Sequence, residues 1–330
     1  MEKKPVDHDW ESAMPESPTE QSPPSSLQAM FWIVVNTLAT IGIVFVNKAV
    51  FSDPSWKSCQ LMFACFHFLV TWMALFVLSR PRFGFFVPSY APFRTMMPLA
   101  VAMCLNVVFP NLSLAFSSVT FYQVARTLLT PAVAVFNFVL HGATLPRMAV
   151  VSLVPVCVGV GIVSYYDSLP ASDADVRTTS ALGIVFAMSG IVASSVYTVW
   201  IGSYQTELKM SSMQLLYNQA PIASLLLVYA IPFCDTLPQW TAVPLSRWLM
   251  ILLSGVFALL INISQFFIVA QAGAVSSTIV GHLKTCSIVA LGWIVSGRAI
   301  GDKSIVGILM AISGIIAYSV IIKQHSAGRI

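Results

Sequence analysis

Gly281-His282-Leu283-Lys284-Thr285 opens the stretch of sequence, continuing to Val295, that indicates the fold of this chain. Lys284 interrupts a run that is otherwise apolar and long enough for a membrane-spanning helix. A lysine ammonium at bilayer depth costs at least ~2.5–3.5 kcal/mol on insertion scales, so such a residue normally faces a water-filled cavity or a partner. We therefore expect Lys284 to line an aqueous site within the membrane.

A second cation occupies a corresponding place in the first half of the chain. Arg126 lies in another apolar run and is followed by Thr127, as Lys284 is followed by Thr285. Two positive charges at matching places in two halves of a membrane protein indicate a central site for an anion.

The composition is that of a polytopic membrane protein. Hydrophobic residues make up 57% of the chain, charged residues only 9%, and the mean hydropathy is +0.81, whereas soluble proteins carry about 25% charged residues. The formal charge of +4 is spread over loops and forms no nucleic-acid patch. The six cysteines show neither metal-binding nor disulfide spacing, so we expect free thiols and no metal site.

Acidic residues are missing from the predicted membrane core. Six of the thirteen fall within the first twenty positions, and the other seven fall in predicted loops or at helix ends. This pattern disfavours a proton or sodium pump and a cation or drug exporter, because these usually place Asp or Glu in a span. It also leaves Arg126 and Lys284 without an acidic partner in the membrane, a place that a substrate anion could fill.

The order of apolar runs predicts an all-α membrane protein with ten transmembrane helices in two inverted five-helix repeats. The expected spans are roughly 27–49, 58–79, 94–115, 117–140, 146–166, 180–202, 211–233, 247–270, 274–297 and 303–323. Residues 1–26 form a disordered tail, 27–166 the first repeat, 167–179 a linker loop, 180–323 the second repeat and 324–330 a C-terminal tail. An odd number of spans per repeat inverts the second repeat, which places a transporter's site near the midplane.

Orientation follows from the basic residues outside the spans. With a cytosolic N-terminus, nine Lys and Arg residues lie on the cytosolic side and six on the other. This bias favours cytosolic positions for both termini.

Polar residues on the predicted helices give the candidate site. Tyr122, Arg126 and Thr130 follow one another at four-residue spacing, and Pro131 can kink the same span. The candidate binding residues are Asn47 and Lys48; Tyr122, Gln123 and Arg126; Tyr217, Asn218 and Gln219; and His282, Lys284 and Thr285. The alternative for single Asn, Gln, Ser and Thr residues, including Asn36, is a hydrogen bond to a neighbouring helix. Lys48 can equally snorkel to the interface, and His282 can equally donate to a backbone carbonyl.

The motifs argue against an enzyme. The chain shows no nucleophile–base arrangement, no metal-ligand spacing and no phosphate-cradling glycine-rich loop. No carboxylate is available within the spans to orient the histidines there, and we expect no cofactor.

Several segments, in this order and spacing, resemble one family of membrane carriers. They are Gly42-Ile43-Val44-Phe45-Val46-Asn47-Lys48, Asn111-Leu112-Ser113-Leu114, Phe121-Tyr122-Gln123-Val124-Ala125-Arg126, Leu216-Tyr217-Asn218-Gln219-Ala220-Pro221 and Gly281-His282-Leu283-Lys284-Thr285. After its tail, the chain resembles the nucleotide-sugar/triose-phosphate translocators of the drug/metabolite transporter superfamily. The Lys284-Thr285 pair is similar to the Lys-Thr subgroup, whose members exchange UDP-sugars for UMP. Arg126 departs from the lysine that the family usually carries.

The resemblance implies an antiporter of nucleotide sugar and nucleoside monophosphate in the Golgi membrane or, alternatively, the endoplasmic reticulum membrane. Lys284, Arg126 and Thr285 would bind the phosphates. Tyr217, Asn218 and Gln219 would read the base, and Tyr122, Gln123 and His282 would line the sugar or ribose region. The alternatives are a GDP-mannose transporter and a sugar-phosphate/phosphate translocator; a non-transporting scaffold would leave the paired cations without a role. The partners are the substrates and the lipid bilayer, with no nucleic acid; base, sugar and a monomeric or homodimeric state stay open.

Overall fold

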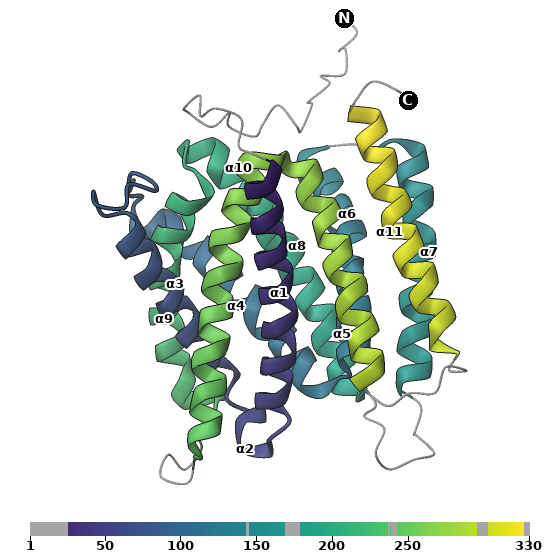
Figure 1. Cartoon of the computed structure of the whole chain (residues 1–330), viewed down its shortest axis with the longest axis horizontal. Coiled ribbons are helices and arrows are strands. Elements are labelled where there is room, and N and C mark those ends of the chain that lie inside the picture. The colour runs from purple at the N-terminus through teal and green to yellow at the C-terminus, as the bar shows by residue number, and fades with distance from the viewer. Residues whose placement is uncertain are drawn as a thin grey trace, which may run out of the picture.

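The computed structural model describes residues 26–142, 145–168, 179–236, 238, 243–295 and 303–326, all of them in helices and short connections. The helices are α1 (Ser26–Phe51), α2 (Pro54–Lys57), α3 (Gln60–Leu78), α4 (Phe93–Phe116), α5 (Val119–Ala125), the 3-10 turn η1 (Arg126–Leu128), α6 (Leu129–His141), α7 (Arg147–Ser168), α8 (Ala181–Leu208), α9 (Ser212–Cys234), α10 (Leu245–Val295) and α11 (Ser304–Ser326). The long helices stand side by side as one bundle, and α1 begins at the same end of the bundle where α11 ends (Figure 1).

The predicted spans agree with these helices to within a few residues, apart from α8, which continues to Leu208. Among the described residues, nine helical segments are long and apolar enough to cross a membrane. Large apolar side chains such as Phe138, Val154 and Tyr229 are exposed on the outside of the bundle. Helices that are apolar all round are typical of proteins whose outer surface faces lipid.

The fourth predicted span is broken where the sequence analysis expected a kink. The chain passes from α5 through the 3-10 turn η1 into α6, and Pro131 is the third residue of α6. Proline has no N–H to donate to the carbonyl four residues earlier, and its ring clashes with that carbonyl. The carbonyl belongs to Thr127, in the middle of η1, so the turn tightens at that point.

The eighth and ninth predicted spans differ from expectation in one respect. We expected two helices joined by a short non-helical connection near residue 272, but the chain is helical without interruption over the 51 residues of α10. Figure 1 shows α10 as two legs that meet at the end of the bundle where α1 begins. The segment Gln271-Ala272-Gly273-Ala274 contains no proline, so no residue there removes a helical N–H donor.

The main helix contacts join residues that are far apart in sequence. The segment pairs with the most extensive packing are α1 with α10, α7 with α11, α4 with α8, and α3 with α9. The α7–α11 contact is especially close at Gly159 and Gly307. A Cβ atom on either glycine would lie within 2.6 Å of the other's carbonyl oxygen, so only glycine permits this approach.

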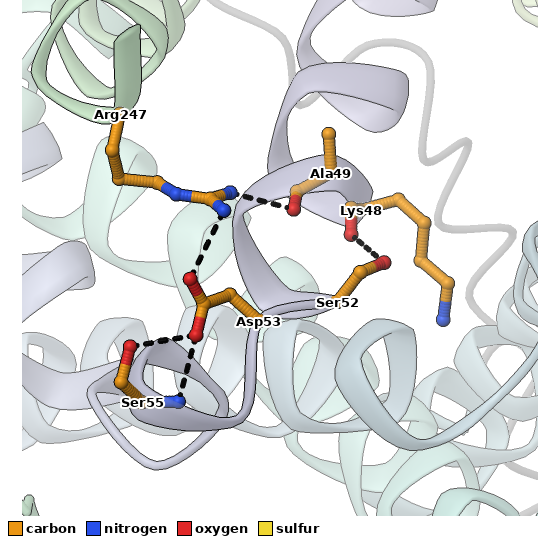
Figure 2. Close-up of polar contacts among 6 residues, drawn as sticks. All are labelled: Lys48, Ala49, Ser52, Asp53, Ser55 and Arg247. Carbon is orange, nitrogen blue, oxygen red and sulfur yellow. Dashed lines mark hydrogen bonds and ion pairs between the residues drawn. The ribbon is translucent and has the colours of Figure 1, made fainter. Parts of the chain in front are cut away.

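An ion pair joins the start of α10 to the connection between α1 and α2, at the opposite end of the bundle from the start of α1. The Arg247 guanidinium at the beginning of α10 lies 3.0 Å from the Asp53 carboxylate and donates to the Ala49 carbonyl at 2.9 Å. Asp53 also caps α2 by accepting hydrogen bonds from the Ser55 amide and hydroxyl. Figure 2 shows that the Lys48 side chain points away from this ion pair.

Candidate functional site

Arg126 lies in η1, between α5 and α6 of the broken fourth span, and its side chain is exposed although its neighbours Val124 and Ala125 are buried. Arg126 lines a pocket between α4, the α5–η1–α6 segment and α8. Ser113 of α4 and Ser194 of α8 line the pocket with Arg126. The break in the helix therefore places a guanidinium beside a cavity in the membrane-spanning region.

Tyr122 holds the guanidinium in place. Arg126 Nη1 donates to the Tyr122 hydroxyl at 2.8 Å, and the ring centre lies 5.6 Å from Arg126 Cζ. The ring is itself buried in a cluster with Val44, Leu114 and Ile288. A guanidinium carries five N–H donors, so most of the donors of Arg126 are available to an anion in the pocket.

Lys284 is held by a residue of α1. Its Nζ donates to Asn36 Oδ1 of α1 at 2.5 Å, and the lysine side chain is half-buried. Arg126 and Lys284 are close enough for their positive charges to repel each other. Among the described residues, neither cation has a carboxylate within ion-pair distance. The geometry therefore brings together two positive charges that a bound anion can neutralise.

A direct hydrogen bond links the two cation-bearing segments. Gln123 Nε2 donates to Thr285 Oγ1 at 3.3 Å, and both side chains are half-buried. Tyr122, Gln123, Arg126, Lys284 and Thr285 thus come together where the fourth span meets the second leg of α10. The side chain of His282, also expected here, lies outside the described residues.

The structure places the two candidate residues of α1 in contacts between helices. Lys48 Nζ donates to the Leu114 carbonyl at 2.8 Å and to the Ser117 carbonyl, at the C-terminal end of α4. A cation at this end is favoured by the helix dipole. Asn47 accepts a hydrogen bond of 2.5 Å from Ser254, whose hydroxyl also lies 2.9 Å from His67 Nε2.

The seventh predicted span, α9, does not line the pocket beside Arg126, whose walls come from α4, the α5–η1–α6 segment and α8. Tyr217 packs against the rings of Phe86 and Tyr90, with ring centres 6.1 and 6.0 Å away.

Asn218 and Gln219 differ in how their amides are used. Asn218 Nδ2 donates to the carbonyls of Ser89 and Gln214 at 2.7 Å, and its Oδ1 accepts from the Ala91 amide at 3.1 Å. Gln219 Nε2 donates to Tyr197 at 2.8 Å, while its buried Oε1 has no hydrogen-bond partner. Of these two amides, only Gln219 keeps a free acceptor.

The pocket-lining residues of α4 and α8 were not among the binding residues predicted from the sequence. Gly190 and Ser194 lie four residues apart, which puts them on one helical face. Gly190 allows α8 to approach α4 closely, because a Cβ atom there would lie 3.1 Å from Pro110 Cδ. Small residues at this spacing are also the ordinary signal of helix packing, so the pattern alone does not identify a binding wall.

Comparison with known proteins gives consistent matches along the chain. Residues 181–320 match the EamA-like transporter family. The chain is 30% identical over 306 residues to UDP-rhamnose/UDP-galactose transporter 3 of Arabidopsis thaliana, covering 91% of this chain and 84% of that protein. It is 28% identical over 292 residues to UDP-xylose transporter 2 of the same organism, covering 86% of this chain and 79% of that one.

A solved crystal structure shares the fold. It is 13% identical to this chain, with a TM-score of 0.55, and the match covers 91% of this chain and 99% of that one. At this identity the likeness concerns the fold alone. The full-length match to the curated transporters carries the family assignment: the chain belongs to the nucleotide-sugar transporter family of the drug/metabolite transporter superfamily.

Proposed function

We propose that this protein is an antiporter that carries a nucleotide sugar, preferably a UDP-sugar, into the Golgi lumen in exchange for nucleoside monophosphate. One observation carries the proposal: Arg126, which lines a pocket, and Lys284 on the second leg of α10 lie within electrostatic range of each other, without a carboxylate partner among the described residues. Phosphate groups supply the negative charges that such a pair requires. The relatives named as UDP-rhamnose/UDP-galactose and UDP-xylose transporters support uridine as the base.

Arg126 and Lys284 would bind the phosphates in this reading, and Thr285 would add a hydroxyl donor. Tyr122 and Gln123 would lie along the sugar or ribose. Among the α9 candidates, Gln219 has the amide best suited to read a base, because its Oε1 is unpartnered and could accept from a base N–H group.

An inverted repeat, residues 27–166 and 180–323, would explain the order of helix contacts. In such a repeat α1 corresponds to α8, α3 to α9, α4 to the first leg of α10, and α7 to α11. The contact α1–α10 then corresponds to the contact α8–α4, and the contacts α3–α9 and α7–α11 each correspond to themselves. The close approach of Gly159 and Gly307 has the same reciprocal character. The site would then lie where the halves meet, with both termini cytosolic.

Obligatory exchange would follow from electrostatics. Closing an empty carrier would bring two uncompensated cations into a site from which water is excluded, where their repulsion is stronger. A bound anion would remove that repulsion and allow the halves to rock between the two faces of the membrane.

Uptake into proteoliposomes tests the proposal. Vesicles would be preloaded with UMP, GMP or inorganic phosphate and offered radiolabelled UDP- and GDP-sugars, with Lys284→Ala as the control variant. We expect UMP-dependent uptake of a UDP-sugar that the variant abolishes. GMP-dependent uptake would indicate a GDP-sugar carrier, and exchange against phosphate alone a sugar-phosphate translocator. Absence of exchange with all three would refute the proposal.

A further inference from the structure

Asn36 makes the contact that fixes Lys284, and its own surroundings leave it no freedom to turn. Its side chain is fully buried in α1. The amide Nδ2 donates to the Ile261 carbonyl at 3.1 Å and to Ser264 Oγ at 2.8 Å, both in the first leg of α10. An ammonium can only donate hydrogen bonds and a carbonyl can only accept them. The Ile261 carbonyl therefore requires the amide Nδ2, and Oδ1 faces Lys284.

The contact leaves Lys284 positively charged and partly free. An ammonium has three N–H donors, and the Asn36 amide receives one of them at 2.5 Å. Because the acceptor is neutral, the lysine keeps its full charge. The remaining two donors can therefore bind a phosphate oxygen while Asn36 keeps the ammonium in position.

Among the described residues, none holds Arg126 in the same way. Its hydrogen bond within the described part of the chain goes to Tyr122, one turn earlier in its own span, whereas Asn36 reaches Lys284 across helices. Lys284 is thus positioned by α1 and the first leg of α10 together. Movement of either segment relative to the second leg changes the place of the ammonium.

We propose that Asn36 is a positioning residue for substrate binding: it aims the Lys284 ammonium at the substrate phosphates, and its neutral amide preserves the charge that makes exchange obligatory. This inference rests on the proposed antiport function. A carboxylate at the same place would form a permanent ion pair with Lys284. It would neutralise the Lys284 charge as a bound anion does, and the carrier without substrate could then reorient to the other face of the membrane.

Two substitutions separate position from charge. Asn36→Leu keeps the branching at Cγ and removes the acceptor; Asn36→Asp keeps the acceptor and adds a negative charge. Thr71→Val is the matched control, because it removes another hydrogen bond between a buried side chain and α10, the 3.2 Å contact that Thr71 accepts from Asn262, away from Lys284. Each protein would be purified, checked for its melting temperature and reconstituted in vesicles with or without internal UMP.

For Asn36→Leu we expect the KM for UDP-sugar to rise at least about tenfold with strict coupling retained, since a hydrogen bond to a charged group contributes roughly that factor or more. For Asn36→Asp we expect slower exchange but a several-fold larger share of uptake into vesicles without internal UMP. Thr71→Val keeps the wild-type KM and coupling.

The inference is overturned if Asn36→Leu binds like wild type, if Asn36→Asp stays as strictly coupled as wild type, or if Thr71→Val raises KM equally. In each of these cases wild-type exchange persists and the proposed function stands. Absence of exchange in the wild type would instead remove the proposed function itself. If Asn36→Leu does not fold, the ratio of uncoupled to coupled uptake in Asn36→Asp decides alone.

Discussion

Replacing Arg126 separates the charge of this side chain from its geometry. Arg126→Gln removes the positive charge, and Arg126→Lys keeps it but replaces a planar fork by a single ammonium. The guanidinium has an accessible pocket beside it and a hydrogen bond of 2.8 Å to Tyr122. We therefore expect phosphate binding to fall in the order wild type, Arg126→Lys, Arg126→Gln.

The size of the effect follows from the charge. Two unit charges 4 Å apart interact by ~4 kcal/mol at an effective dielectric constant of ~20, and water in the pocket reduces this value. We expect Arg126→Gln to lose about 2.7 kcal/mol of binding free energy, a factor of about 100. Arg126→Lys loses one charge-assisted hydrogen bond, which corresponds to a factor of about 10.

The assay is competition against radiolabelled UDP-sugar exchange in proteoliposomes. UMP and uridine serve as paired competitors, because they share the base and ribose and differ in the phosphate. Arg126→Gln should weaken inhibition by UMP by the factor above and leave inhibition by uridine unchanged. Equal losses for both competitors, or unchanged inhibition by UMP, would refute the assignment of Arg126 to the phosphate.

Three further predictions concern stability. Gly307→Ala should lower the free energy of unfolding by about 1–3 kcal/mol through overpacking, since its Cβ atom would lie 2.6 Å from a carbonyl of α7. The control Gly161→Ala, with open space around the glycine, should change the free energy of unfolding by less than about 1 kcal/mol. The melting temperatures of the two variants in detergent test this difference. Hydrogen bonds from Ser55 and the charge of Arg247 lower the pKa of Asp53 below 3.8. The ionised Asp53 carboxylate therefore stabilises the folded protein at neutral pH, and this stabilisation is lost as the pH falls through the lowered pKa. Asp53→Asn should therefore lower the melting temperature at pH 7, by an amount that shrinks in acid; an equal difference at every pH would exclude this cause. Asn218→Ala should destabilise the protein by about 1–3 kcal/mol, because it leaves backbone groups unpaired. We expect the preference for UMP over GMP to stay unchanged; a changed preference would show that Asn218 takes part in reading the base.

Hydropathy was sufficient to predict most helices of this protein. Apolar runs mark nearly all the helix ends to within a few residues, because in lipid each helix must satisfy its backbone hydrogen bonds internally. The break near Arg126 was also predictable, since Pro131 removes a specific donor. The two legs of α10 were expected as the spans 247–270 and 274–297, but the helical course of the chain between them was not, because a short connection between two apolar runs resembles a loop in sequence.

The cations of the site could be predicted, but their partners could not. Arg126 and Lys284 stand out because charge is rare in apolar runs. Asn36, by contrast, resembles any polar residue that bonds a neighbouring helix. Its partner lies 248 positions away, and only the packing of α1 on α10 reveals the contact. Lys48 is the opposite case. Its charge stands out in the sequence as clearly as that of Lys284, but its side chain donates to carbonyls at the end of α4.

The neutrality of Asn36 matters as much as the charge of Lys284. A UDP-sugar carries one negative charge on each of its two phosphates, and a nucleoside monophosphate carries about −1.5 to −2 near neutral pH. In the proposed exchange, either ligand would therefore nearly balance Arg126 and Lys284, and exchanging one for the other would leave the loaded site close to neutral in both directions. A carboxylate beside Lys284 would leave one positive charge for either ligand to balance. The fully buried amide of Asn36 provides a hydrogen-bond acceptor at that position and would leave both positive charges to the proposed substrate.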